Sequence, residues 1–212
     1  MYLSSSAPAR RPYRMRKRAA AAAATRARII AAALDLFMRE PVDEISLRDV
    51  AAHAGVALQT LVRQMGSREG LIRTVAAALH EQVAARRFAA PVGDVRAAVA
   101  ILLAHYEANG QRLLRALAQE ERLAALHEAL EAGRGAHRQW VATVFAPFLP
   151  EAPAARRLRL AQLAAVTDVH LWHVLRTDQG LSATEAEAAV VDLVRRLVEE
   201  VEEGGRGWRA SC

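Results

Sequence analysis

Two pairs of side chains in this sequence could hold a metal ion or transfer protons. His170 and His173 lie three residues apart, which puts both on one face of a helix. Two histidines are half of a zinc site, and the single cysteine of the chain is Cys212, its last residue. Glu120 and Glu121 are adjacent, so in a helix they point away from each other. We therefore expect no metal site, no cofactor and no catalytic residue, and hence no enzyme.

Basic residues give a stronger signal because they are unevenly distributed. The chain has 212 residues and a net charge of +6. Residues 1–90 contain 15 basic and 7 acidic residues, which gives +8, whereas residues 91–212 contain 14 and 16, which gives −2. This asymmetry indicates a polyanion-binding module joined to a module with another role. The cluster at 10–18 supplies much of the excess, so charge alone leaves open a basic tail on a neutral helical protein.

The composition favours an all-α fold. Hydrophobic residues make up 53% of the chain, aromatic residues only 5%, and Gly (11) and Pro (7) are scarce. Alanine, the best helix former, accounts for 48 residues. No apolar run approaches the length of a membrane span, and the N-terminal sequence does not have the pattern of a signal peptide. We therefore expect a cytoplasmic protein of about nine helices that does not contact a membrane.

Two short helices joined by a glycine are the most specific structural signal. Ser46 and Asp49 have the spacing of a capping box and begin the first short helix, which Gly55 ends. The second short helix runs to about Met65, and Ser67 can cap the longer helix that follows. With an amphipathic helix before them, these elements form the layout of a helix-turn-helix at about 46–65 within a three-helix domain.

Three segments of this region also carry a family pattern. They are Ile29-Ile30-x-x-Ala33-Leu34-x-Leu36-Phe37, Ser46-Leu47-Arg48-Asp49-Val50-Ala51-x-x-Ala54-Gly55-Val56, and Thr60-Leu61 followed by Gly66-Ser67-Arg68-Glu69-x-Leu71. On these residues the stretch Arg26–Leu79 resembles the DNA-binding domain of tetracycline-repressor (TetR) family transcriptional regulators. The run from Thr167 to Arg176, followed by Gly180-Leu181-Ser182, resembles the corresponding region of some members.

The resemblance implies a two-part organisation: a three-helix DNA-binding domain and a larger helical domain for ligand binding and dimerisation. The expected divisions are a disordered basic arm at 1–22, the DNA-binding domain at 23–83, the ligand-binding and dimerisation domain at 84–203 and a tail at 204–212. Each of the last two long helices, expected at 154–178 and 182–203, has an apolar stripe with charged borders. We expect them to form a homodimer interface as a four-helix bundle.

Matching the family positions assigns expected DNA contacts, with a pseudo-palindromic double-stranded operator as the partner. The resemblance places Thr60, Gln64 and Arg68 at phosphates, and Arg48, Leu58, Gln59 and Arg63 toward base edges. Four positions depart from the family: Ala57 replaces a small polar cap, Val62 a tyrosine, Gln64 a histidine or tyrosine, and Met65 a phenylalanine. These departures predict weaker or re-tuned DNA binding within the same fold.

Aromatic and histidine residues between 94 and 178 are candidates for an effector site. They are His105, Tyr106, His137, Trp140 and Trp172. We expect them to line a mostly apolar cavity for a small molecule, against the alternative that they are core or surface residues. The predicted function is a ligand-responsive transcriptional regulator, a repressor that its effector releases from the operator. The alternative is a helical enzyme or interaction module whose degenerate helix-turn-helix no longer binds DNA specifically.

Overall fold

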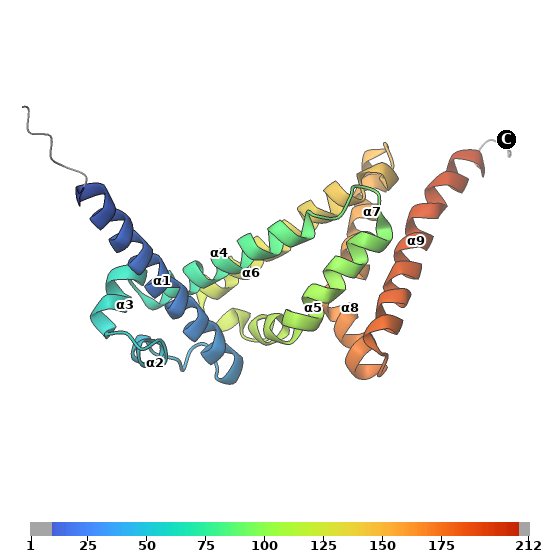
Figure 1. Ribbon diagram of the computed structural model, residues 1–212. Coiled ribbons are helices and arrows are strands. Elements are labelled where there is room, and N and C mark those ends of the chain that lie inside the picture. The colour runs from blue at the N-terminus through green and yellow to red at the C-terminus, as the bar shows by residue number, and fades with distance from the viewer. Residues whose placement is uncertain (1–9, 208–212) are drawn as a thin grey trace, which may run out of the picture. The chain divides into compact units, whose positions relative to one another are not determined.

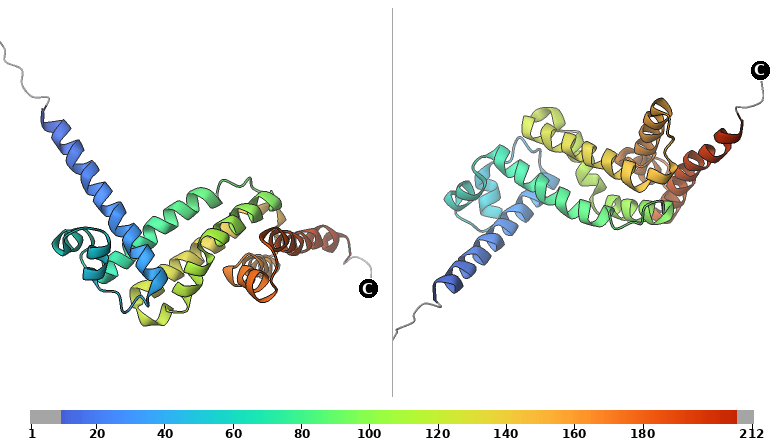
Figure 2. Two further views of the ribbon diagram at one scale, coloured as in Figure 1. Left: turned by 60° about the horizontal axis from the view of Figure 1, so that its bottom comes forward. Right: turned by 90° about the horizontal axis from the view of Figure 1, so that it is seen from above.

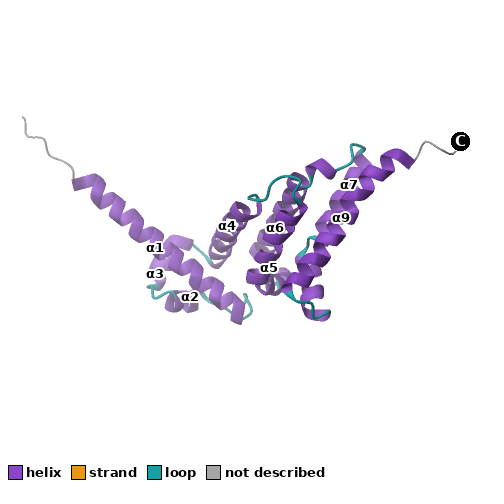
Figure 3. Ribbon diagram, turned by 45° about the vertical axis from the view of Figure 1, so that its right-hand side comes forward, coloured by secondary structure: helices purple, strands orange, loops and turns teal. Residues whose placement is uncertain are grey.

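The computed structural model describes residues 10–207, and this part of the chain contains helices and loops but no strand (Figures 1 and 3). The all-α prediction is confirmed. The chain divides into two compact units, Met1–Val75 and Ala76–Cys212. The division falls within one helix, earlier than the expected boundary between residues 83 and 84.

Unit 1 contains three helices and the beginning of a fourth. They are α1 (Arg10–Arg39), α2 (Leu47–His53), α3 (Leu58–Met65) and the first part of α4 (Arg68–Arg87). α2 packs against both α1 and α3, and these three helices meet in Figure 1. One side chain from each helix illustrates the apolar core: Ile29, Val50, Leu61 and Leu71 are all buried. The predicted three-helix domain with its helix-turn-helix is therefore present.

The first helix corrects the prediction of a disordered arm. α1 begins at Arg10, so the prediction for 1–22 is wrong for residues 10–22, and residues 1–9 lie outside the described part of the chain. Residues 19–24 are all alanine, the residue type with the highest helix propensity. The flanking Arg, Lys and Met residues are also good helix formers. Pro12 lies in the first turn, where a missing N–H does not cost an intrahelical hydrogen bond.

Unit 2 is a larger helical unit around one apolar core. After the end of α4 it contains α5 (Val95–Leu117), α6 (Ala124–Val144), α7 (Pro153–Val166), α8 (Val169–His173) and α9 (Ala183–Gly207). Short 3₁₀ turns lie at Glu120–Arg122 and Ala146–Phe148, and a π-helical turn at Val174–Asp178. α5 packs against α6, α8 and α9, and α7 packs against α6 and α9. Figure 2 shows α5 between α6 and α9.

Two helices of unit 2 differ from what local sequence signals indicate. Gly110, a residue type that often ends a helix, lies inside α5, and a Cβ atom there would come within 2.3 Å of the Trp172 ring. The helix expected at 154–178 is instead divided. Thr167 donates through Oγ1 to the carbonyl of Leu163 at 2.6 Å, and Asp168 caps α8. A hydroxyl that bonds back to its own helix competes with continuation of that helix.

The last helix extends beyond its predicted end. α9 reaches Gly207, so the expected tail at 204–212 is wrong for residues 204–207, while 208–212 lie outside the described residues. Its start is as predicted, because Ser182 and Glu185 form reciprocal hydrogen bonds in a capping box. None of the helices described by the structure is long and apolar enough to cross a membrane.

Candidate functional site

The turn between α2 and α3 fixes the geometry of the helix-turn-helix. Gly55 has a positive φ of 63°, which a residue with a side chain rarely adopts. The amide of Val56 then donates to the carbonyl of Ala51 at 3.0 Å. Ser46 accepts from the amide of Asp49, whose carboxylate accepts in return from the amide of Ser46. The Ser46 hydroxyl also donates to this carboxylate, and that hydrogen bond is the largest cause of the lowered pKa of Asp49.

The two faces of α3 differ in the way that the pattern predicted. Leu61 and Met65 are buried against the core of unit 1. Gln59 and Arg63 are exposed on the opposite side, and Arg48 is exposed on α2. Leu58, Thr60 and Gln64 are partly buried. The structure thus brings the seven expected DNA-contacting residues into one unit, with three of them fully available to a partner.

Two departures from the family pattern have visible consequences on α3. Ala57 occupies the N-cap position with extended backbone angles, and its side chain provides no capping hydrogen bond. Val62 is 41% exposed, so an apolar side chain lies on the outer face where the family usually has a tyrosine. At this position the chain lacks a hydrogen-bond donor for a phosphate.

Arg68 is less free than the sequence suggested. Its Nη2 donates to the carbonyl of Val42 at 2.6 Å, which ties the start of α4 to the loop before α2. Its Nε is buried without a partner among the described residues. Ser67 accepts from the amide of Gly70, as expected for the residue that caps α4. Arg68 therefore has a structural role in unit 1 whether or not it also contacts a phosphate.

The five effector-site candidates form two groups of neighbouring rings in unit 2, His137 with Trp140 and Tyr106 with His105 and Trp172. Trp140 stacks against His137 at a centroid distance of 5.6 Å, and Tyr106 lies 6.1 Å from Trp172 and 5.8 Å from His105. Tyr106 and Trp140 are buried in the core, where Tyr106 donates to the carbonyl of Thr167 at 3.0 Å. Trp172 donates to the Glu107 carboxylate at 2.7 Å.

Sequence reasoning missed Arg87 of α4, which contacts one ring of each group. Its guanidinium lies 5.5 Å from the ring centroid of Tyr106 and 5.9 Å from that of Trp140, and its backbone carbonyl accepts from Trp140. A signal existed: the apolar positions 71, 75, 79 and 83 recur every four residues along α4, and Arg87 continues that series. A charged residue on an apolar stripe is an exception that can mark a site.

The histidines beside Arg87 are held in the neutral form. Burial lowers the pKa of His105 and of His137 to about 4, and the positive charge of Arg87 contributes to both shifts. Burial also lowers the pKa of His80, again with a contribution from Arg87. Because a guanidinium only donates, Nδ1 of His137 accepts from Arg87 at 3.3 Å, and Nε2 carries the proton toward the carbonyl of Ala164.

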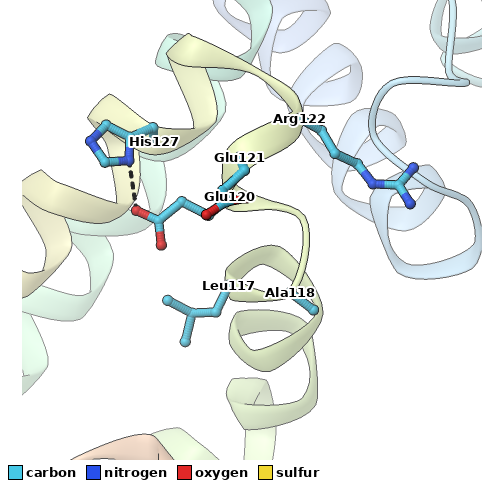
Figure 4. Close-up of a pocket in the computed structure, with 6 residues that line it drawn as sticks. All are labelled: Leu117, Ala118, Glu120, Glu121, Arg122 and His127. Carbon is cyan, nitrogen blue, oxygen red and sulfur yellow. Dashed lines mark ion pairs between the residues drawn. The ribbon is translucent and has the colours of Figure 1, made fainter.

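A pocket of about 660 Å³ lies elsewhere in unit 2, where α5 turns into α6. Its lining consists of Leu117, Ala118, Glu120, Glu121, Arg122 and His127 (Figure 4). His127 and Glu120 form an ion pair at 2.8 Å across it, while the Arg122 side chain points away from that pair. The lining is largely charged and includes none of the five effector-site candidates, so this pocket is not the expected apolar cavity.

Comparison with known proteins agrees with the geometry of both units. Residues 29–75 match the sequence model of the tetR family of bacterial regulatory proteins. A transcriptional regulator from Rhodococcus sp. Rha1 superposes with a TM-score of 0.66 at 18% identity, over 82% of this chain and 96% of that chain. A TetR-family transcriptional regulator from Streptomyces coelicolor gives 0.64 at 16% identity, over 84% and 88%.

A third solved structure has a more specific description. NalD, the secondary repressor of the MexAB-OprM multidrug efflux pump in Pseudomonas aeruginosa, gives a TM-score of 0.51 at 20% identity, over 87% of this chain and 97% of that chain. No curated protein matches the chain. The fold of unit 1 and the exposed face of α3 define a helix-turn-helix domain. A domain with the sequence pattern of the tetR family of bacterial regulatory proteins therefore occupies residues 29–75 of this chain.

Proposed function

We propose that this protein is a repressor that binds operator DNA through unit 1 and is released when unit 2 binds a small molecule. The outer face of the helix-turn-helix carries the proposal, because Arg48, Gln59 and Arg63 are exposed there while the inner face holds α3 to the core. Arginine reads guanine and glutamine reads adenine in the major groove. Such a regulator acts in the cytoplasm, where the DNA is, and catalyses no reaction.

The basic N-terminal half of α1 extends the proposed DNA-binding surface. Residues 10–28 include eight Arg and Lys and no acidic residue. Arg16, Lys17 and Arg18 are exposed, as are Arg26 and Arg28. We propose that these cations contact phosphates beyond the base pairs that α3 reads. Each phosphate contact that is lost reduces the slope of log affinity against log salt by about one.

Dimerisation would place two such units on one operator. We propose that α7 and α9 form the interface, within the ranges 154–178 and 182–203. Leu158 on α7 is 61% exposed and Leu193 on α9 is 37% exposed, and charged residues border both. Two helices from each chain form a four-helix bundle with two-fold symmetry. Light scattering of the double variant Leu158→Glu, Leu193→Glu would show a monomer if this interface is the correct one.

Selection of bound sequences from random double-stranded DNA tests the function. We expect the full chain to enrich one pseudo-palindrome, whose two halves lie about one helical turn apart. The triple variant Arg48→Ala, Gln59→Ala, Arg63→Ala is the matched control, because it removes only exposed side chains and should enrich nothing. If the wild-type chain also enriches no sequence, the alternative holds: the uncapped α3 and the exposed Val62 mark a helix-turn-helix that no longer reads DNA.

A further inference from the structure

Arg87 is a buried charge whose usual partner is missing. Arg87 is 9% exposed, and among the described residues the hydrogen-bond partner of its guanidinium is His137 rather than an acidic side chain. Its Nε is buried and has no hydrogen-bond partner in that part of the chain. Buried charges in proteins are normally paired, because the loss of hydration costs several kcal/mol. The structure therefore contains a cation without its anion.

The groups in contact with Arg87 are neutral, and the carboxylate that acts on them, Asp168, forms no ion pair with it among the described residues. His137 accepts one hydrogen bond from Nη1 at 3.3 Å, and the rings of Tyr106 and Trp140 present their π-electrons at 5.5 and 5.9 Å. Cation–π contacts of this kind offset only part of the cost of burying an unpaired charge. The edge of the guanidinium that includes Nε has no partner among the described residues. Its N–H groups can donate two parallel hydrogen bonds to the oxygens of a carboxylate.

We propose that Arg87 binds the carboxylate of a small organic acid in unit 2, with the apolar part of the acid against the core around Tyr106 and Trp140. An inorganic anion fits less well, because the surroundings of the guanidinium are aromatic. His80, His105 and His137 are half-buried and lie on three different helices, so the cluster reaches the surface of unit 2 at these side chains. The acid enters by displacing them.

This inference rests on the proposed function only in naming the chemistry of the effector, and it refines the mostly apolar molecule expected from sequence. Binding by Arg87 stands as a property of unit 2 even if DNA is not released. The competing account is structural: the guanidinium is packed between two rings and binds nothing.

Titration calorimetry of the DNA-free full chain at neutral pH tests the proposal. The probes are benzoate and octanoate, each paired with its uncharged amide, benzamide and octanamide, and sodium chloride as the inorganic anion. We expect at least one acid to bind about tenfold or more tightly than its amide, because only the acid supplies the missing charge. Chloride at equal concentration should give no saturable heat.

Two variants assign the effect to Arg87. Arg87→Met keeps the length and apolar stem of the side chain, and we expect it to reduce acid binding at least about tenfold without changing binding of the amide. Arg86→Met is the matched control, because Arg86 is the exposed neighbour on the same helix, and it should bind the acid as wild type does. If Arg87→Met does not fold, Arg87→Lys keeps the charge without the two-donor edge and should also weaken acid binding.

The outcomes separate the two accounts. Failure of both acids to bind, equal affinity for acid and amide, or equal losses in the Arg86 and Arg87 variants would overturn the carboxylate site. A mobility shift with operator DNA is run separately. Acid binding that leaves operator affinity unchanged refutes the effector role but not the site, and failure of the wild-type chain to bind any operator refutes the proposed function alone.

Discussion

Unit 1 presents three of its candidate binding residues to solvent, whereas unit 2 holds three of its candidates in the core. Arg48, Gln59 and Arg63 are exposed, while Tyr106 and Trp140 are 2% and 1% exposed. Exposed side chains contribute little to folding, so a change in unit 1 affects binding with little effect on stability. In unit 2 the same buried side chains would have to stabilise the fold and also bind the effector. Mutations can therefore separate the two properties in one unit and not in the other.

The largest expected effect is the replacement of Trp140 by alanine. The side chain is fully buried, and its indole N–H donates to the Arg87 carbonyl at 3.1 Å. Removal leaves a cavity and an unpaired carbonyl, and we expect the free energy of unfolding to fall by about 3–5 kcal/mol. Urea denaturation measures it. Gln59→Ala is the control from unit 1 and should change stability by less than about 0.5 kcal/mol; equal losses would remove the contrast between the units.

Arg48→Ala is the corresponding test in unit 1. We expect DNA affinity to fall by about 1–3 kcal/mol, with relaxed choice at one base position, because a base-reading arginine is lost. The melting temperature should not change, because the side chain is exposed. Binding is measured on a set of single-base operator variants. A uniform loss across all of them would place Arg48 at a phosphate and contradict the base-reading role.

The pH dependence of stability provides the third test, and it concerns unit 2. Burial, with Arg87 as the second cause, lowers the pKa of His105 and His137 to about 4, below the value near 6.5 of an unfolded histidine. Between these values the unfolded chain binds more protons than the folded chain. Stability is therefore complete above pH about 6.5 and falls as the pH drops toward about 4.

The size of this effect is limited by exposure. A fully buried histidine contributes up to about 1.4 kcal/mol per pH unit, and His105, which is only half-buried, contributes less. His137→Gln keeps an acceptor for Arg87 and a donor for Ala164 without a titrating group, so the slope should become shallower. Tryptophan fluorescence reports on unit 2, since all three tryptophans follow residue 75. His53→Gln in unit 1 should leave this slope unchanged; an equal change in both variants would contradict the assignment.

Arg68→Ala tests an exception to this contrast. Arg68 belongs to unit 1, but its side chain is hydrogen-bonded to the loop before α2, so its loss should affect both binding and stability. Loss of its hydrogen bond to the Val42 carbonyl should reduce stability by about 1 kcal/mol. If Arg68 also contacts a phosphate, DNA affinity falls equally for all sequences and the salt slope falls by about one per subunit. Thermal unfolding and salt-dependent titrations measure the two effects. A loss of DNA affinity without a loss of stability would show that the hydrogen bond to Val42 does not stabilise unit 1.

Local sequence patterns were sufficient for most of unit 1 and for the all-α fold. The capping boxes at Ser46 and Ser182 depend on residues three positions apart, and the turn at Gly55 depends on one residue. Interactions of this range are visible in the sequence itself. The same local reasoning gave too much weight to charge and proline at the N-terminus, and too little to the alanine run that makes residues 10–22 helical.

The features that sequence reasoning missed depend on contacts between distant residues. Gly110 lies within a helix because it leaves room for Trp172, and nothing adjacent to Gly110 indicates this. The break at Thr167 adjoins His137 and Tyr106, which come from two other helices. Arg87 was visible as a charged residue on an apolar stripe, but its unpaired state depends on which side chains of α5 and α6 surround it.

The smallest expected effect is the gain in stability from adding an N-cap to α3. Within unit 1, α2 has a side-chain cap and α3 has none. Ala57 has backbone angles of −66° and 141°, close to the extended conformation of Ser46, which does cap its helix. A serine hydroxyl at position 57 can therefore accept from an amide of the first turn of α3. We expect Ala57→Ser to raise the free energy of unfolding of unit 1 by about 0.5–1 kcal/mol. Ala52→Ser, at an exposed position inside α2, is the control and should lower it slightly, because serine is a poorer helix former than alanine. Thermal unfolding followed by circular dichroism measures both variants, and equal shifts would mean that α3 does not need a cap.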